Sequence, residues 1–316
     1  MFLKSLFWQG VNNLIKIFLE VFIFDRKIRR ILKGNWAKFY LRKYVSAAQK
    51  FSSLEVQLPT NNGNSQAAKL QDLQTSVLWQ YWESKDGTVP PLVQACLNSV
   101  ERYRGKFNRI LLTPQNVKDY VDIPEIFWDL KEKGIIKTAF FSDILRTCLL
   151  IQHGGIWIDS TVLLTEELPS YITNADLFVF QNDLKIDLDG LNMASYFIAS
   201  KKDNKILKET LSALIQYWKE NRFLVNYFTF LHTFTMVTQA SKENKELFSN
   251  VPFFSFLPVQ QFQSELLEQF SEERWDEIKK ISGIHKLTHK QSVLTKKKEI
   301  DTIGTFYEHV IKEYGG

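Results

Sequence analysis

The first apolar pattern in the chain lies at its N-terminus. Lys16 and Glu20 interrupt it, so no run reaches the roughly 18 uncharged residues of a membrane span, and no small-residue cleavage site indicates a signal peptide. Apolar side chains recur there at the spacing of one helix face. The pattern predicts an amphipathic helix whose stripe consists of Leu3, Phe7, Val11, Leu14, Phe18 and Val21, widened by Ile15 and Phe22.

A polar, turn-rich stretch separates this region from the rest of the chain. Residues 59–76, PTNNGNSQAAKLQDLQTS, lack the apolar density of the segments on either side. We therefore predict a linker over residues 59–75. It would join an N-terminal amphipathic and basic helical region, residues 1–58, to a domain formed by residues 76–316.

Short apolar runs alternate with helical patterns after the linker. SVLWQYW, NRILLT and IWID are typical of buried strands, whereas PPLVQACLNSVERY, PEIFWDLKEKG and FSDILRTCLLIQHGG have helical spacing. DLFVFQN and SYFIAS add two strands before a long helix expected over residues 201–220. Because strands that alternate with helices form βαβ units, we expect an α/β fold with a mostly parallel sheet.

The charge of the chain is unevenly distributed. The 316 residues carry a net charge of +5, yet the first 50 hold eleven Lys and Arg against two acidic residues, so that arm is +9 and the remainder −4. A basic arm on a slightly acidic body argues against nucleic acid as a partner. Cations beside an amphipathic helix are typical of binding to an anionic bilayer. Residues 1–45 should therefore bind such a surface; the alternative is that the apolar stripe packs on the protein's own core.

The cysteines indicate the cellular compartment, and the composition indicates that the chain folds. Cys96 and Cys148 lie within apolar helical patterns and suit neither a disulfide framework nor a zinc site. We therefore expect a cytoplasmic protein, peripheral on the inner face of the cell membrane if the basic arm binds lipid. A hydrophobic content of 45% excludes global disorder.

Several candidate functional residues lie close together in residues 141–161, FSDILRTCLLIQHGGIWIDST. Ser142 is expected to cap a helix there, which would put Asp143 and Arg146 on one face of its first turn. The pair would present a carboxylate and a guanidinium to a ligand. The alternative is a capping aspartate with a surface ion pair.

Asp159 follows a short buried strand predicted over residues 156–158. Open α/β sheets bind ligands at the carboxyl ends of their strands. A carboxylate at that place can hold a hard divalent cation, and such a cation can neutralise a diphosphate leaving group. The alternative is that Asp159 caps a turn.

Together these motifs resemble those of a known enzyme family. The pattern S-D-x-x-R followed by G-G-I-W-I-D is similar to that of sugar transferases with a DXD motif, most closely the bacterial capsular polysaccharide synthesis glycosyltransferases. The resemblance extends over residues 76–300 and leaves the first 75 outside. It implies a GT-A-type fold, a Rossmann-like α/β domain that binds a nucleotide sugar and Mn²⁺ or Mg²⁺.

The resemblance also implies roles for individual residues. Asp143 and Arg146 would contact the donor sugar and ribose, with the backbone of Ser142 on the nucleotide. Asp159 would hold the ribose and the metal ion. The remaining implied roles are base stacking by Trp82, with Trp79 as its nearest rival, metal binding by Thr161 and His285, and diphosphate binding by Lys286.

One position departs from the family's pattern. Thr161 stands where the DXD motif has its second Asp, so the motif here is D-S-T. A hydroxyl or water can complete the coordination of Mg²⁺ or Mn²⁺; the alternative is a transferase-like binding or scaffold protein without activity. We reject Asp187 and Asp189 as a second DXD motif, because Gly190 beside them indicates a loop.

The predicted function is transfer of a sugar from a nucleoside-diphosphate sugar, in the first instance a UDP-sugar, to a bacterial surface glycan such as capsular polysaccharide, free or lipid-linked. The resemblance implies retention of the anomeric configuration, with the departing diphosphate helping to deprotonate the acceptor. No phosphate-binding loop or Ser-His-Asp arrangement supports a kinase or a hydrolase. On the acceptor side we expect Gln181, Asn182, Asn192 and His232.

Overall fold

The computed structural model describes residues 2–51, 77–84, 87–182, 190–290 and 301–316. The linker predicted over residues 59–75 lies outside the described residues, and so do Asp187 and Asp189.

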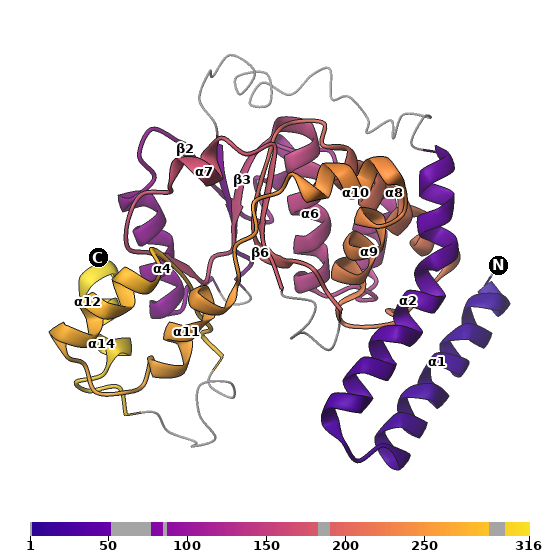
Figure 1. Ribbon diagram of the computed structural model, residues 1–316, viewed down its shortest axis with the longest axis horizontal. Coiled ribbons are helices and arrows are strands. Elements are labelled where there is room, and N and C mark those ends of the chain that lie inside the picture. Colours follow the sequence, from indigo (N-terminus) through magenta and orange to yellow (C-terminus); the bar gives the residue numbers. More distant parts are fainter. Residues whose placement is uncertain (1, 52–76, 85–86, 183–189, 291–300) are drawn as a thin grey trace.

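A five-stranded sheet in the order β2-β1-β3-β6-β5 lies at the centre of the molecule (Figure 1). β1 runs parallel to β2 and β3, whereas β6 runs antiparallel to both β3 and β5. Four of these strands therefore point the same way and β6 is reversed, which confirms the mostly parallel sheet. The strands are β1 (Val77–Tyr81), β2 (Asn108–Leu112), β3 (Gly155–Ile158), β5 (Leu177–Phe180) and β6 (Ala194–Ser200).

Alternation along the strands creates a separate core on each face of the sheet. Trp79 and Trp157 belong to the larger core, whereas Leu78 and Ile156 face the other. The helices that supply the larger core are α2 (Arg26–Phe51), α5 (Glu125–Glu132), α6 (Thr138–His153), α8 (Lys205–Glu220) and α9 (Thr229–Thr238), with α10 (Lys242–Ser249) at its edge. Val100 of α4 (Pro91–Arg102) and Ile172 of α7 (Ser170–Thr173) contribute to the smaller core. The short 3₁₀ helix η1 (Val117–Asp119) adds Val117 to the larger core.

A second, two-stranded sheet joins the middle of the chain to its C-terminal part. β4 (Val162–Leu164) pairs antiparallel with β7 (Ile284–Lys286), so that Val162 lies opposite Lys286. Three C-terminal helices surround this sheet in a third apolar cluster: α11 (Leu257–Glu265), α12 (Glu272–Ile281) and α14 (Phe306–Tyr314). The pairing brings residue 286 next to the segment that follows β3.

The helix α6 begins at Thr138, four residues before the predicted capping residue. Ser142 therefore lies inside the helix, and Asp143 and Arg146 are not in its first turn, so both expectations were wrong. Phe140 and Phe141 are buried against the core. Packing of these two rings accounts for the extra turn, because tertiary burial outweighs the capping preference of serine.

Two glycines form the turn from α6 into β3. Gly154 has φ 70° and Gly155 has φ 99°, conformations that side chains with a Cβ rarely adopt. A Cβ on Gly155 would lie 2.5 Å from the carbonyl oxygen of Val77. The glycine pair thus lets β3 lie directly against β1, and this places Asp159 at the far end of the strand.

The N-terminal helices α1 (Phe2–Phe22) and α2 form a hairpin, hereafter the hairpin (Figure 1). α2 packs along α8 and α9, and the turn of the hairpin extends beyond the body of the molecule. The predicted stripe of α1 points outward, with Phe7 64% and Phe18 54% exposed. Packing of this stripe on the protein's own core, one of the two alternatives, is therefore wrong. Among the described helices, none has a long enough apolar stretch to cross a membrane.

Candidate functional site

Asp159 stands at the carboxyl end of β3, beside the reversed strand β6. Its amide donates to the carbonyl of Tyr196 at 2.9 Å, and its carbonyl accepts from the amide of Val162 at 2.9 Å. The indole Nε1 of Trp157 donates to Asp159 Oδ1 at 2.8 Å. The strand and the turn after it therefore hold the carboxylate in one orientation.

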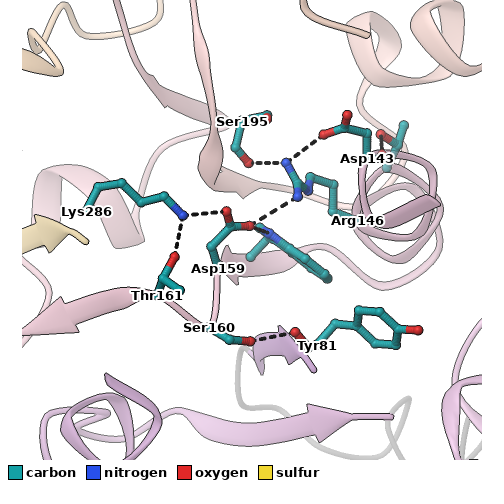
Figure 2. A network of polar contacts seen from close by, with 10 residues as sticks. Tyr81, Asp143, Arg146, Asp159, Ser160, Thr161, Ser195 and Lys286 are labelled. Atoms are coloured by element: carbon teal, nitrogen blue, oxygen red, sulfur yellow. Dashed lines mark hydrogen bonds and ion pairs between the residues drawn. The ribbon is translucent and has the colours of Figure 1, made fainter. Parts of the chain in front are cut away.

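Arg146 of α6 reaches the same carboxylate from the helix above the sheet. Its Nη2 lies 3.1 Å from Asp159 Oδ1, and its Nη1 lies 2.8 Å from Asp143 Oδ1 and 2.6 Å from the carbonyl oxygen of Ser195 (Figure 2). The guanidinium carbon is 4.9 Å from the ring centre of Trp157. Because the Arg146 side chain is only 5% exposed, this is a buried bridge between two carboxylates and not a surface ion pair.

Lys286 approaches Asp159 from the side opposite to Arg146 (Figure 2). Its Nζ donates to Asp159 Oδ2 at 2.8 Å and to Thr161 Oγ1 at 2.6 Å. The pairing of β7 with β4 brings the lysine there. Its side chain is 21% exposed, so the ammonium group is within reach of a ligand from solvent.

The two carboxylates have different electrostatic surroundings. Burial alone would raise the pKa of Asp159, but Lys286 and Arg146 outweigh it and hold that pKa below its ordinary value. Burial raises the pKa of Asp143 to about 6, against the attraction of Arg146 and with the help of the Asp159 charge. One guanidinium is shared by two carboxylates, and Asp159 has Lys286 in addition. Asp159 is therefore the stably ionised member of the pair.

The donor atoms around Asp159 do not fit a metal ion held by the protein. Arg146 donates to one oxygen of this carboxylate and Lys286 donates to the other. Lys286 also donates a hydrogen bond to the hydroxyl of Thr161. In the described part of the chain, no three His, Cys, Asp or Glu side chains gather as ligands for a metal would. The Mn²⁺ or Mg²⁺ implied by the resemblance stays a prediction, and the chemistry below uses the cationic side chains.

Comparison with known proteins identifies the family. The family model for capsular polysaccharide synthesis proteins matches residues 7–310. The chain belongs to this family. The match includes the hairpin, which the resemblance seen in the sequence had left outside.

Two individual proteins are similar to this capsular polysaccharide synthesis family member. One is the protein named O-glycosyltransferase braB from Annulohypoxylon truncatum, 27% identical over 158 residues that make up 45% of this chain and 37% of that relative. The chain thus spans little more than a third of that relative's length. The other is the solved structure named PaToxG Glycosyltransferase, with a TM-score of 0.39 and 14% identity over 80% of this chain and 95% of that one. The GT-A subtype stays a prediction.

His285 does not join the site, although it was expected to bind the metal. Successive residues of a strand point to opposite sides, so the side chain of His285 faces away from that of Lys286. Its ring lies 5.4 Å from that of Phe262 and 6.5 Å from that of Trp275, and it is 1% exposed. Burial lowers its pKa to about 4, so it is a neutral core residue at pH 7.

The two tryptophans considered for base stacking differ in their surroundings. Trp79 is fully buried, and its indole Nε1 donates to the carbonyl of Gly154 at 2.9 Å, which leaves no ring face for a base. Trp82 follows the end of β1, is half-buried, and packs edge-on against His289. The structure therefore contradicts the role for Trp79 and leaves Trp82 as the candidate. Ser142 is half-buried within α6, one residue before Asp143.

Two of the four acceptor candidates, Gln181 and Asn192, are engaged inside the protein. The side chain of Gln181 donates to the carbonyl of Pro252 at 3.0 Å, and that of Asn192 donates to Thr238 Oγ1 at 2.8 Å. Both are buried, so they hold loops together and the structure does not support their contact with an acceptor. Asn182 is half-buried beside Gln181. His232 lines a pocket at the hairpin, which is described below.

Three contributors to the site were not predicted. Trp157 was assigned only to a buried strand, yet its indole orients Asp159. Ser195 accepts from Arg146 through its carbonyl, a contact that no side-chain motif could signal. Ser160 donates to the carbonyl of Tyr81 at 2.5 Å and so ties the turn after β3 to β1 (Figure 2). The contact of Trp157 with Asp159 could have been predicted, because residues two apart in a strand lie on the same side of it.

Proposed function

We propose that this protein is a glycosyltransferase that takes its sugar from a nucleoside-diphosphate donor bound at the carboxyl end of β3. The observation that carries the proposal is the convergence of Arg146 and Lys286 on Asp159 at this end of the sheet. Membership of the capsular polysaccharide synthesis family and the likeness to a protein named as an O-glycosyltransferase support sugar transfer.

In the proposed site Lys286 receives the diphosphate. The bond between the sugar and the diphosphate breaks as negative charge builds up on the leaving phosphate, and a cation fixed nearby stabilises that charge. Lys286 is partly exposed, donates to oxygens of Asp159 and Thr161, and lies 5.5 Å from the ring centre of Tyr196, so its ammonium group can exchange one of the two oxygens for a phosphate oxygen. Thr161, in place of a second Asp, leaves this lysine less neutralised than a carboxylate would.

Asp143 and Asp159 would then bind hydroxyl groups of the donor sugar and ribose. Carboxylates accept hydrogen bonds from such hydroxyls, and Arg146 keeps both carboxylates in fixed positions. The Arg146 Nε–H finds no acceptor among the described residues. The two terminal nitrogens of Arg146 make its contacts with Asp143, Asp159 and Ser195.

The acceptor and the stereochemistry follow from the family and the resemblance. We propose a bacterial surface glycan such as capsular polysaccharide, free or lipid-linked, as the acceptor, and a UDP-sugar as the first donor to examine. Retention of the anomeric configuration belongs to the same proposal. Direct analysis of the product's linkage tests both.

Calorimetry with a panel of nucleotide sugars tests the donor site. At least one donor should bind the full chain, in Mn²⁺ and in chelator alike if the cationic side chains suffice. Lys286→Gln should weaken that binding by about 10 to 100-fold, the amount expected for a hydrogen bond to a charged group. Lys290→Gln is the matched control, because Lys290 is an exposed lysine four residues along.

Two results would overturn the proposal. The first is that no nucleotide sugar binds under either metal condition, which would favour a transferase-like scaffold. The second is unchanged binding by the Lys286→Gln protein. Binding that occurs only with Mn²⁺ would return the diphosphate role to the metal implied by the resemblance and contradict its assignment to Lys286.

A further inference from the structure

The side of α1 that faces the protein is mixed: it includes the polar Ser5 and Asn12 together with the apolar Leu19, which is 6% exposed, and the half-buried Trp8. Ser5 and Asn12 are 4% and 1% exposed, and both make inward hydrogen bonds: Ser5 Oγ accepts from the amide of Arg222 at 3.0 Å, and Asn12 Oδ1 accepts from Trp36 Nε1 at 2.9 Å. The opposite side of the helix carries eight exposed apolar residues, namely Leu3, Leu6, Phe7, Leu14, Ile17, Phe18, Val21 and Phe22. A surface helix of a water-soluble protein normally turns its apolar stripe toward the core, whereas most of the stripe of α1 is exposed.

The exposed apolar surface continues past the turn of the hairpin. Phe24, in the turn, is 88% exposed. On α2 the exposed apolar residues are Ile28, Leu32 and Phe39, and they lie on the side away from the core residues Ala37, Leu41 and Tyr44. An apolar surface that extends over two helices marks an interaction site.

Cations lie at the start of α2, where they do not stabilise the helix. Asp25 Oδ1 accepts from the amides of Lys27 and Ile28 and so caps the helix. The first turn itself holds no acidic residue, and it contains the exposed Arg26 and Lys27. Positive charge at a helix N-terminus opposes the helix dipole, so these residues suit an external anion better than the helix.

A pocket of about 420 Å³ lies between the hairpin and residues 225–232. Its wall includes one carboxylate, Glu20, and five cations: Lys16, Arg26, Arg29, Arg30 and Lys33. Glu20 pairs with Arg29 and Lys33. Burial, and after it the neighbouring Lys33, lower the pKa of Lys16.

One buried polar atom of a pocket residue has no hydrogen-bond partner among the residues that the structure describes. His232 is 1% exposed, lines the pocket, and its Nδ1 makes no hydrogen bond within the described residues. Burial lowers its pKa to about 3, so the ring is neutral and can donate one N–H to an anion. A phosphate oxygen would satisfy this donor and the surplus of cations together.

We propose that the hairpin docks on an anionic phospholipid bilayer, with its exposed apolar surface in the acyl boundary and a lipid phosphate in the cationic pocket. Interfacial helices place their apolar side 5 to 10 Å deep and keep their cations at the level of the headgroups. The hairpin has both sides in that arrangement. This inference does not depend on which donor the strand-end site binds.

The alternative partner for this apolar surface is a second copy of the chain. The first 50 residues carry a net charge of +9, so a twofold contact through the hairpin would bring two strongly positive regions together. An anionic surface supplies the opposite charge. Charge complementarity therefore favours the bilayer.

Co-sedimentation of the full chain with vesicles tests the proposal. The protein should bind mixed phosphatidylglycerol and phosphatidylcholine vesicles, and bind much less to phosphatidylcholine alone or at high salt. The double change Phe18→Ser and Phe22→Ser should weaken binding at least about tenfold. The changes Arg26→Gln and Lys27→Gln should weaken vesicle binding by roughly fivefold for each charge removed.

Matched controls lie at exposed positions outside the hairpin. Phe253→Ser removes a ring that is 59% exposed, close to the 54% of Phe18. Lys279→Gln with Lys280→Gln removes two adjacent cations from α12. These variants should bind vesicles as the unchanged protein does, and every variant should keep its donor binding in calorimetry.

Three results would overturn the proposal. They are absence of binding to anionic vesicles, equal binding to neutral ones at all salt concentrations, and unchanged binding by the Phe18 and Phe22 variant. Analytical ultracentrifugation tests whether a second copy of the chain binds this surface. If the unchanged protein is a dimer that does not bind vesicles, and the Phe18 and Phe22 variant is a monomer, the surface is a dimer interface. Failure of donor binding alone would leave the docking proposal standing.

Discussion

The strand-end site and the hairpin pocket both gather cations, but they balance them differently. At the end of β3, Arg146 and Lys286 face two carboxylates, Asp143 and Asp159, and the charges are largely buried. The described residues that line the hairpin pocket include five cations and one carboxylate, Glu20, which pairs with Arg29 and Lys33. The first arrangement is an internal network that positions groups for a ligand. The second has more cations than carboxylates along its described wall, which suits an external anion.

The largest effect should come from opening the strand-end network. Arg146→Met leaves Asp143 and Asp159 buried without the guanidinium they share, and breaking a buried ion pair from one side destabilises a protein by about 3–5 kcal/mol. Urea denaturation measures the free energy of unfolding. A loss below about 1 kcal/mol would show that the network is not a buried one.

A surface ion pair provides the control for that measurement. Arg102 lies 3.8 Å from Glu313, and its side chain is 55% exposed. Arg102→Met should lower the free energy of unfolding by less than about 1 kcal/mol, because water screens exposed pairs. Equal losses in the two variants would remove the distinction between buried and exposed cations.

The second effect concerns His285, on the apolar side of the same strand as Lys286. Its pKa is lowered to about 4 from 6.5, so its contribution to stability is present above pH 6.5 and is lost as the pH falls through about 4. Between pH 7 and 4 the protein should lose about 3 kcal/mol more than its His285→Phe variant does. The difference between the two at pH 7 reports the packing change alone. Parallel pH dependences would mean that the ring is solvated.

Much of the fold could be predicted because the segments that form the sheet carry local patterns. The runs around β1, β2, β3, β5 and β6 are short, apolar and bounded by turns, and each strand was placed. The start of α6 was misplaced, because the burial of Phe140 and Phe141 depends on distant residues that the local pattern does not contain. The outward orientation of α1 was equally inaccessible, since spacing defines a stripe but not what it faces.

The candidate site could be predicted as far as neighbouring residues suffice. Asp143, Arg146 and Asp159 lie in one short segment, and the structure brings them together. Lys286 was implied by the resemblance, and the pairing of β7 with β4 places it there. His285 was assigned to the metal from the same segment, and strand alternation puts it on the opposite side. A strand of three residues is too short for its alternation to stand out in the sequence.

A smaller effect should separate the two carboxylates. The pKa of Asp143 is raised to about 6 from 3.8, so its contribution to stability is present below pH 3.8 and is lost as the pH rises through about 6. Compared with Asp143→Asn, the unchanged protein should therefore lose about 2 kcal/mol of unfolding free energy between pH 4 and 7.

The paired measurement uses the other carboxylate. Asp159 has a lowered pKa, so relative to Asp159→Asn its stability contribution is lost as the pH falls below its ordinary value near 3.8. The two variants should thus deviate from the unchanged protein with opposite signs. Deviations of the same sign would contradict the unequal sharing of Arg146.

The smallest effect should come from the one carboxylate of the hairpin pocket. Glu20 is half exposed and pairs with Arg29 and Lys33, so Glu20→Gln should leave thermal stability nearly unchanged, as for most surface pairs. Removing its charge makes the pocket more positive, and binding to anionic vesicles should tighten on the order of fivefold. Asp276→Asn is the control, since this carboxylate is similarly exposed but lies on α12, paired with Lys279. If Glu20→Gln weakened vesicle binding instead, the ion pairs would be holding the hairpin in its binding conformation, and the surplus of charge would not be what attracts the surface.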